Sequence, residues 1–172
     1  MLHVVDVHGC VGAPIAFPRG GYDIVGDIIV DSWKLVVDTD VVVAAFRSPS
    51  GASAELLLRI ARGETVMLLS VALALEYESI CLKKEHWTAA GLTHRQAVTF
   101  VDTIIGLGER VRIRYHLRPQ LRDAGDEMVL ETAVNGCADA IVTFNARDYG
   151  KVGAHFGIEI LPPREAVRRL RQ

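Results

Sequence analysis

The sequence contains only three cysteines, and this scarcity excludes several kinds of site. Cys10, Cys81 and Cys137 lie far apart, are odd in number and form no C-x-x-C pair. Neither a disulfide framework nor a thiolate zinc site is therefore expected, and we predict a cytoplasmic protein because a reducing compartment suits unpaired thiols. The six histidines show no H-x-x-x-H spacing, so a histidine metal site is not expected either.

Long hydrophobic runs and a strong net charge are also missing. The longest apolar stretch, residues 66–75, is interrupted by Ser70 and is much shorter than the roughly 20 residues that a membrane-spanning helix needs. No basic segment followed by an apolar stretch opens the chain, so we expect no secretory signal. The formal net charge is −2, and binding of nucleic acid would therefore require a local basic patch.

What the sequence does contain fits one folded domain with an added N-terminal segment. Its 172 residues are 50% hydrophobic, which is enough for a single core. Residues 1–33 hold four aspartates against one arginine and are rich in glycine and proline, which permits only short strands such as 28–30. We predict an N-terminal extension of uncertain order over residues 1–33 and a folded domain over residues 34–172.

From Lys34 onward, short β-branched runs alternate with segments of helical periodicity. The predicted strands cover residues 35–37, 66–69, 111–113, 140–143 and 158–161, and the predicted helices cover residues 52–62, 71–83, 94–105, 126–135 and a last segment from 163. Ser70 is placed to cap one helix, and Thr93 and Gln96 have the spacing of a capping box. This alternation predicts an α/β fold with a parallel five-stranded sheet covered on both faces. Residues 35–37 would form its central strand and residues 111–113 an edge strand.

Several polar residues lie beside the carboxyl ends of the predicted strands, where parallel sheets bind ligands. They are Asp38, Glu76, Asp126, Asn145 and Asp148. Carboxylates in one cleft repel one another and raise each other's pKa unless a divalent cation neutralises them. Oxygen ligands suit Mg²⁺ or Mn²⁺ better than zinc. Such an ion activates water and stabilises charge on a phosphoryl oxygen, which fits hydrolysis of a phosphodiester.

Four blocks of sequence occur in order between residue 34 and about residue 163. They are VVDTDVVV (36–43), SVALALEYESI (70–80), DAGDE (123–127) and ADAIVTFNARDY (138–149). Together they resemble the PIN-domain ribonuclease family, most closely its branch of toxins from type II toxin–antitoxin pairs. The resemblance implies a three-layer α/β/α sandwich with a five-stranded parallel sheet, and Mg²⁺- or Mn²⁺-dependent cleavage of RNA. It also implies a cognate antitoxin that blocks the acidic cleft, and homodimers are common in such families.

The resemblance also implies roles for single residues. Asp38 matches the first metal-binding acid, Glu76 the second acid, and Asp126 a third acid that is also a metal ligand. Two positions depart from the pattern, because Asp40 stands where the family usually has asparagine and Asn145 stands where a fourth acid is often found. An amide can orient a metal-bound water but adds no negative charge. Metal affinity is therefore expected to be lower unless Asp148 substitutes through a water.

Each candidate also has a structural interpretation. Glu76 could be a solvated helix residue, and Asp126 could be only an N-cap that stabilises its helix by roughly 1 kcal/mol. Thr143 and Asn145 could be turn residues or could position substrate or water. Arg147, together with the arginine-rich third strand, could contact RNA phosphates or belong to an ordinary charged surface.

Two other functions stay open. The run Asp38-Thr39-Asp40-Val41 and the later Ile141-Val142-Thr143 also fit haloacid-dehalogenase-type phosphatases, in which Asp38 would be the nucleophile and Asp40 the acid/base. That family needs a later lysine and an acidic pair, but only Lys151, Asp148 and Glu159 follow Thr143. The chain could also be a catalytically silent PIN-like module that binds RNA or a partner, an alternative motivated by the missing fourth acid.

Overall fold

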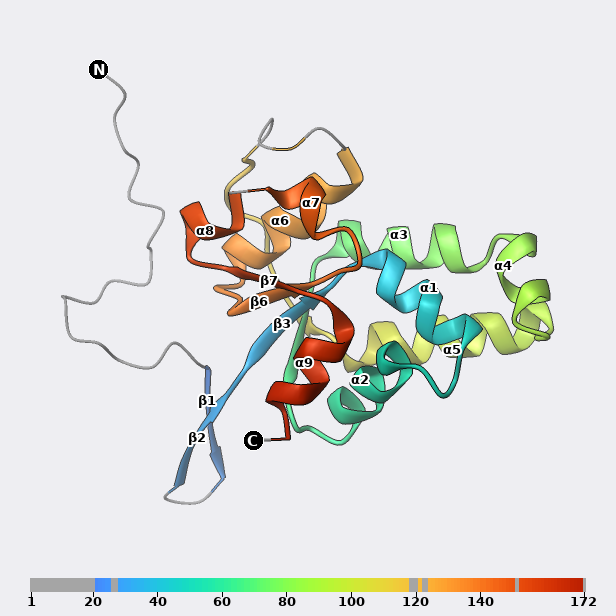
Figure 1. The fold of residues 1–172 in the computed structure, drawn as a ribbon, viewed down its shortest axis with the longest axis horizontal. Coiled ribbons are helices and arrows are strands. Elements are labelled where there is room, and N and C mark those ends of the chain that lie inside the picture. The colour runs from blue at the N-terminus through green and yellow to red at the C-terminus, as the bar shows by residue number, and fades with distance from the viewer. Residues whose placement is uncertain (1–20, 26–27, 118–120, 122–123, 151, 172) are drawn as a thin grey trace.

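The fold is built around a five-stranded sheet, seen in a computed structural model that describes residues 21–25, 28–117, 121, 124–150 and 152–171. All neighbouring strands pair in parallel, and their order is β5-β4-β3-β6-β7 (Figure 1). The strands are β3 (Lys34–Val37), β4 (Val66–Leu69), β5 (Glu109–Arg110), β6 (Ala140–Val142) and β7 (Glu159–Leu161). β3 is the central strand, as predicted.

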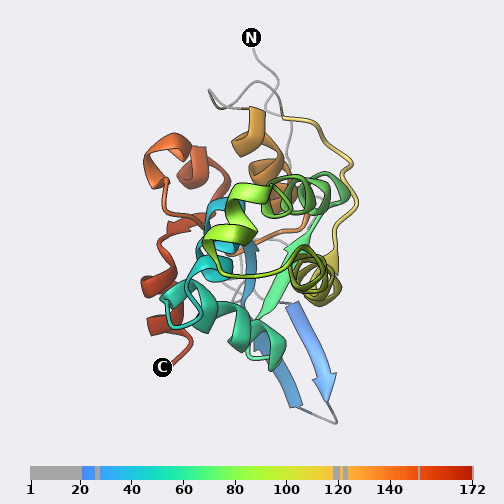
Figure 2. The ribbon, with the colours of Figure 1, turned by 90° about the vertical axis from the view of Figure 1, so that its right-hand side faces the viewer.

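Helices connect the strands and lie on both faces of the sheet. Among the described residues they are α1 (Thr39–Arg47), α2 (Ala52–Ala61), α3 (Val71–Cys81), α4 (Lys84–Ala89), α5 (His94–Leu107), α6 (Ala124–Asn135), α7 (Ala146–Tyr149), α8 (Val152–Phe156) and α9 (Pro163–Arg169). Figure 2 shows α9 and α5 on opposite sides of the strands. The prediction of an α/β fold with a five-stranded parallel sheet is confirmed.

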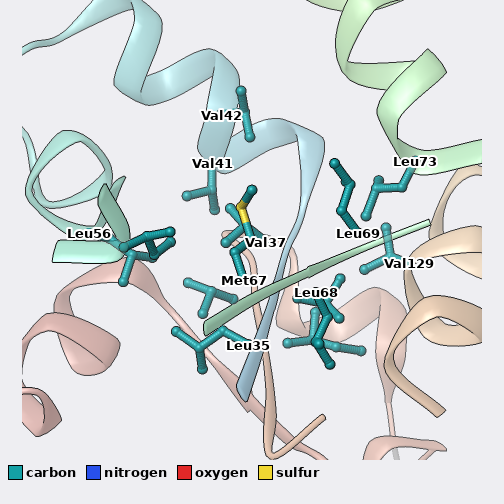
Figure 3. Packing of buried hydrophobic residues seen from close by; sticks show 14 of the residues in the cluster. Leu35, Val37, Val41, Val42, Leu56, Met67, Leu68, Leu69, Leu73 and Val129 are labelled. Atoms are coloured by element: carbon teal, nitrogen blue, oxygen red, sulfur yellow. The ribbon is translucent and has the colours of Figure 1, made fainter. Parts of the chain in front are cut away.

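Burial on both faces of the sheet explains why the central strand is a continuous apolar run. Leu35, Val36 and Val37 of β3 are all fully buried, because helices cover both faces and every position of a central strand then meets apolar side chains. Figure 3 shows Val41 of α1 and Leu56 of α2 on one side of the strands, and Val129 of α6 near Leu68 on the other. The core therefore lies on both sides of the sheet and leaves its carboxyl edge for polar residues.

The third strand was predicted at the wrong residues. β5 consists of Glu109–Arg110, and only the N–H of Val111 continues the pairing, to the carbonyl oxygen of Leu69 at 2.9 Å. Beyond it the chain turns toward α6, because the backbone N–H groups of Arg114 and Tyr115 donate to Oδ1 of Asn135 at 2.8 and 2.9 Å. The chain therefore leaves the sheet where the sequence pattern predicts a strand.

Some helices were also missed or placed inaccurately. α1, α4, α7 and α8 were not predicted, and α5 runs through Gly106 to Leu107 instead of ending at residue 105. Asp126 is the third residue of α6 and not its N-cap, so the purely capping interpretation of this residue is wrong. The predicted caps at Ser70 and Thr93 are present in the structure.

The described part of the N-terminal extension forms a hairpin. β1 (Gly21–Val25) and β2 (Ile28–Ser32) pair in antiparallel fashion in a two-stranded sheet of their own. The predicted short strand at 28–30 is therefore present and longer than expected, whereas residues 1–20 lie outside the described residues. Within the described ranges, no single helix is long and apolar enough to cross a membrane, and only the bent pair α1 and α2 meets those criteria jointly.

Candidate active site

Asp38 lies at the carboxyl end of the central strand. Its backbone N–H donates to the carbonyl oxygen of Val142 at 2.9 Å, which joins the ends of β3 and β6. Asp38 is the N-cap residue of α1, yet its side chain makes no capping hydrogen bond. The residue is 7% exposed, and its Oδ2 accepts a hydrogen bond from the hydroxyl of Tyr149 at 3.0 Å. The carboxylate is thus directed toward other groups of the site rather than toward its own helix.

Asp40 lies in the first turn of α1 and joins this helix to the turn after β6. Its Oδ2 accepts hydrogen bonds from the N–H of Phe144 at 3.0 Å and from Oγ1 of Thr143 at 3.3 Å. Its Oδ1 is buried and has no hydrogen-bond partner among the described residues. Burial, and next the negative charge of Asp38, raise the pKa of Asp40 to about 6.

Glu76 reaches the same edge from the middle of α3. The hydroxyl of Thr39 donates to Oε1 of Glu76 at 3.2 Å, and Thr39 directly follows Asp38. Glu76 is half-buried, whereas Glu78 on the same helix is exposed. Glu76 is therefore part of the polar cluster and not a solvated helix residue.

Two fully buried tyrosines lie near these acids. Burial raises the pKa of Tyr77 well above its usual value, and the charges of Asp38, Glu76 and Asp40 raise it further. Burial also raises the pKa of Tyr149, with further contributions from Asp38, Asp126 and Asp40. Such charge effects weaken with distance.

The structure therefore places Glu76 beside the residue that follows Asp38, and brings the charges of Asp38 and Asp126 near the buried hydroxyl of Tyr149, although these acids lie far apart in the sequence. It adds Asp40, which is not among the predicted site residues. Asp40 was open to detection, because it stands two residues after Asp38 in the D-T-D run at the end of the central strand. Tyr149 carries no comparable sequence signal, because its partner Asp38 is 111 residues away.

The remaining predicted residues lie at or after the end of β6. Thr143 is fully buried, donates to Asp40 and accepts from the N–H of Asn145 at 2.9 Å, so it holds the turn together. Asn145, Arg147 and Asp148 are exposed, with Asn145 at the N-cap of α7 and the other two within that helix. These three residues are thus available to a ligand that approaches the acids from solvent.

The donor atoms of this cluster fit a hard divalent cation. They are carboxylate oxygens, one of which, Oδ1 of Asp40, is buried without a hydrogen-bond partner in the described part of the chain. Among the described residues, no three histidine, cysteine or acidic side chains are grouped closely enough to enclose an ion. Magnesium does not require such an enclosure, because it is commonly held by one or two carboxylates together with waters and substrate phosphates.

Most of the folded domain matches a known protein family. A protein-family model described as PIN domain matches residues 34–147, which include β3 to β6 and every acid of the cluster. No curated protein matches the chain.

Proposed function

The chain belongs to the PIN-domain family, and from this membership we propose that it is a Mg²⁺- or Mn²⁺-dependent endoribonuclease that acts in the cytoplasm. PIN domains are generally nucleases that use divalent metal ions. The observation that best supports the proposal is the buried Asp38 at the end of β3, with Glu76 beside the residue that follows it and with the charge of Asp126 acting on the same buried hydroxyl, that of Tyr149. We assign the nuclease to residues 34–172, which begin at β3.

We assign metal binding to Asp38 and Asp126 and the role of second acid to Glu76. A divalent cation bound there would lower the pKa of a water and stabilise negative charge on the phosphoryl oxygen. We propose that the half-buried Glu76 carboxylate, which accepts a hydrogen bond from Thr39, would take up a proton from water. Asp40 stands where the family usually has asparagine, and it adds a fourth carboxylate to the site. The added negative charge increases the requirement for a cation.

The exposed residues of the turn and of α7 are suited to the substrate. We propose that Arg147 pairs with an RNA phosphate and that Asn145 and Asp148 orient water; all three residues are exposed at the N-cap of α7 or within this helix. We propose that Thr143 supports substrate binding indirectly, since it is buried and connects Asp40 to the turn. The basic groups that bind RNA are then local, consistent with the net charge of −2.

We further propose that the chain is the toxin of a toxin–antitoxin pair, and that a cognate antitoxin blocks the acidic cluster. This rests on the sequence resemblance to that branch of the family. A short neighbouring reading frame that encodes a DNA-binding head and an amphipathic tail would support it. Homodimerisation belongs to the same proposal, and size-exclusion chromatography with light scattering measures it directly.

Cleavage of labelled RNA by the purified chain in Mn²⁺ tests the assignment. We expect Asp38→Asn and Asp126→Asn each to lower the rate by about 100-fold or more, since metal stabilisation of the transition state is worth several kcal/mol and about 1.4 kcal/mol is tenfold in rate. Glu76→Gln should also impair cleavage, whereas Glu78→Gln, on the exposed face of α3, should not. Cleavage that survives Asp38→Asn and Asp126→Asn would mean a contaminant or a misplaced site.

The silent binding module is the second candidate, favoured by Asn145 at the position of the fourth acid. It predicts that the wild-type chain binds RNA and never cuts it in Mg²⁺ or Mn²⁺. The phosphatase hypothesis loses support, because the family match includes the D-T-D run and β6 and assigns both to a PIN domain. A phosphoryl-aspartate at Asp38 would reinstate it.

A further inference from the structure

Tyr149 is the last residue of the four-residue helix α7, and it is fully buried although its three helical neighbours are exposed. Its hydroxyl donates to Oδ2 of Asp38 at 3.0 Å. Within the described part of the chain, no other group donates a hydrogen bond to this carboxylate. Because Asp38 itself is 7% exposed, water has little access to replace that bond.

The protein contains a second buried tyrosine that serves as a comparison. Tyr77 of α3 is also fully buried, and its hydroxyl donates to the carbonyl oxygen of Val37, the residue before Asp38. The two hydroxyls lie beside the same carboxylate cluster and differ in their acceptor. Tyr77 holds the backbone, and Tyr149 holds the side chain of a proposed metal ligand.

Segment 144–149 is attached to the start of α1 at both of its ends. At one end the N–H of Phe144 donates to Asp40, and at the other Tyr149 donates to Asp38. Between these two attachments lie the exposed residues Asn145, Arg147 and Asp148. The bond from Tyr149 therefore fixes one oxygen of Asp38 and also fixes the far end of the segment that faces solvent.

We propose that Tyr149 is a positioning residue that holds Oδ2 of Asp38, so that Oδ1 is presented to a divalent cation in one orientation. This inference rests on the proposed function, because it assigns a purpose to Asp38 as a metal ligand. Hydrogen bonds to metal-ligating carboxylates commonly set metal affinity in this way.

The test compares Tyr149→Phe with Tyr77→Phe, since each variant removes one buried hydroxyl and leaves the ring in place. Mn²⁺ binding is measured by isothermal titration calorimetry, and urea unfolding reports stability. We expect Tyr149→Phe to weaken Mn²⁺ binding by about 10-fold or more, and Tyr77→Phe to change Mn²⁺ binding by less than about 3-fold. Both variants should lower the free energy of unfolding by similar amounts. In an Asp38→Asn background, Tyr149→Phe should have no further effect on the Mn²⁺ affinity that remains. Equal Mn²⁺ affinity in the two single variants would overturn the inference.

Kinetics of RNA cleavage separate this inference from the function on which it rests. Tyr149→Phe should lower kcat at a fixed Mn²⁺ concentration and recover when Mn²⁺ is raised, with little change in KM for RNA. A wild-type chain that neither binds Mn²⁺ nor cuts RNA overturns the proposed function as well. A wild-type chain that does both, with Tyr149→Phe indistinguishable from it, overturns only the role of Tyr149.

If Tyr149→Phe fails to fold, crystals of the wild-type chain soaked in Mn²⁺ decide. An ion on Oδ1 of Asp38 with the hydrogen bond from Tyr149 intact supports the inference, and an ion on Oδ2 contradicts it.

Discussion

Asp38 occupies the N-cap position of α1 without capping that helix through its side chain. An aspartate at this position usually accepts a hydrogen bond from the first turn, which is worth about 1 kcal/mol. Here the carboxylate accepts instead from Tyr149, deep in the site. A residue that forgoes its local stabilising contact for a distant one is typical of a functional position.

The sequence offered the acids one by one as candidates. Asp38 follows an apolar strand and Asp126 lies in the first turn of a helix, whereas Glu76 was chosen by the resemblance to the family. Their partners could not be predicted, because Tyr149 and Thr143 act across separations of 111 and 103 residues. The burial of Oδ1 of Asp40 without a hydrogen-bond partner in the described part of the chain could not be predicted either, because burial depends on the three-dimensional fold.

The raised pKa of Asp40 makes stability depend on pH. The folded chain holds this proton up to a pH of about 6, whereas the unfolded chain releases it near 3.8. The folded state therefore binds more protons between these values, and the free energy of unfolding falls as pH rises through this window and stays lower above it. Because the carboxyl is only partly buried, solvent screening reduces this contribution to about 1 kcal/mol.

Asp40→Asn should therefore stabilise the protein at pH 7.5 by about 1 kcal/mol and leave its stability near pH 4 almost unchanged. The amide keeps an acceptor oxygen for Phe144 and removes the charge. Urea unfolding at both pH values, without divalent cations, measures the difference. The exposed Asp148→Asn serves as control and should change neither value. If Asp40→Asn lowered the free energy of unfolding at pH 7.5, the negative charge of Asp40 would not be what destabilises the cation-free fold.

At the scale of the elements, strands with buried faces on both sides were the most predictable parts. β3, β4 and β6 are β-branched or aliphatic runs bounded by polar residues, and the edge strand β7, in which Glu159 is exposed, was also predicted. α1 was missed because its sequence, TDVVVAAFR, begins with a run of valines that is as typical of a strand as of a helix. β5 was misplaced because the side chain of Asn135 pairs with backbone groups that a strand would otherwise use.

The cap of α3 connects element structure to the site, since α3 carries Glu76 and Tyr77. Oγ of Ser70 accepts from the N–H of Leu73 at 3.3 Å and from the hydroxyl of Thr132 at 2.8 Å, and Ser70 is 2% exposed. We expect Ser70→Ala to lower the free energy of unfolding by about 2 kcal/mol, because both the cap and a buried partner are lost. Urea unfolding measures the change.

Thr93→Ala is the matched variant for Ser70→Ala. Thr93 belongs to an exposed capping box on α5, where water can replace its hydrogen bonds. Its loss should be about 1 kcal/mol or less. If Thr93→Ala were the more destabilising of the two, the buried hydrogen bonds of Ser70 would not be what fixes α3.

For the whole molecule, the topology concentrates negative charge at one edge of the sheet. Parallel strands with the order β5-β4-β3-β6-β7 bring their carboxyl ends to the same edge, and β3 and β6 are neighbours there. Acids that follow different strands then lie at this edge without any local motif. We expect mutual repulsion of these acids to destabilise the cation-free fold, and a bound divalent cation to relieve it.

The measurement that tests this account most directly is the unfolding of the wild-type chain and of an Asp38→Asn, Asp126→Asn double variant, each with and without Mn²⁺. We predict that Mn²⁺ at about 100 times its Kd stabilises the wild-type chain by about 2.7 kcal/mol, the gain from one site that only the folded state possesses. The double variant should be stabilised far less by the same concentration. Equal stabilisation of both proteins, or none of the wild type, would contradict the claim that these acids share a divalent cation.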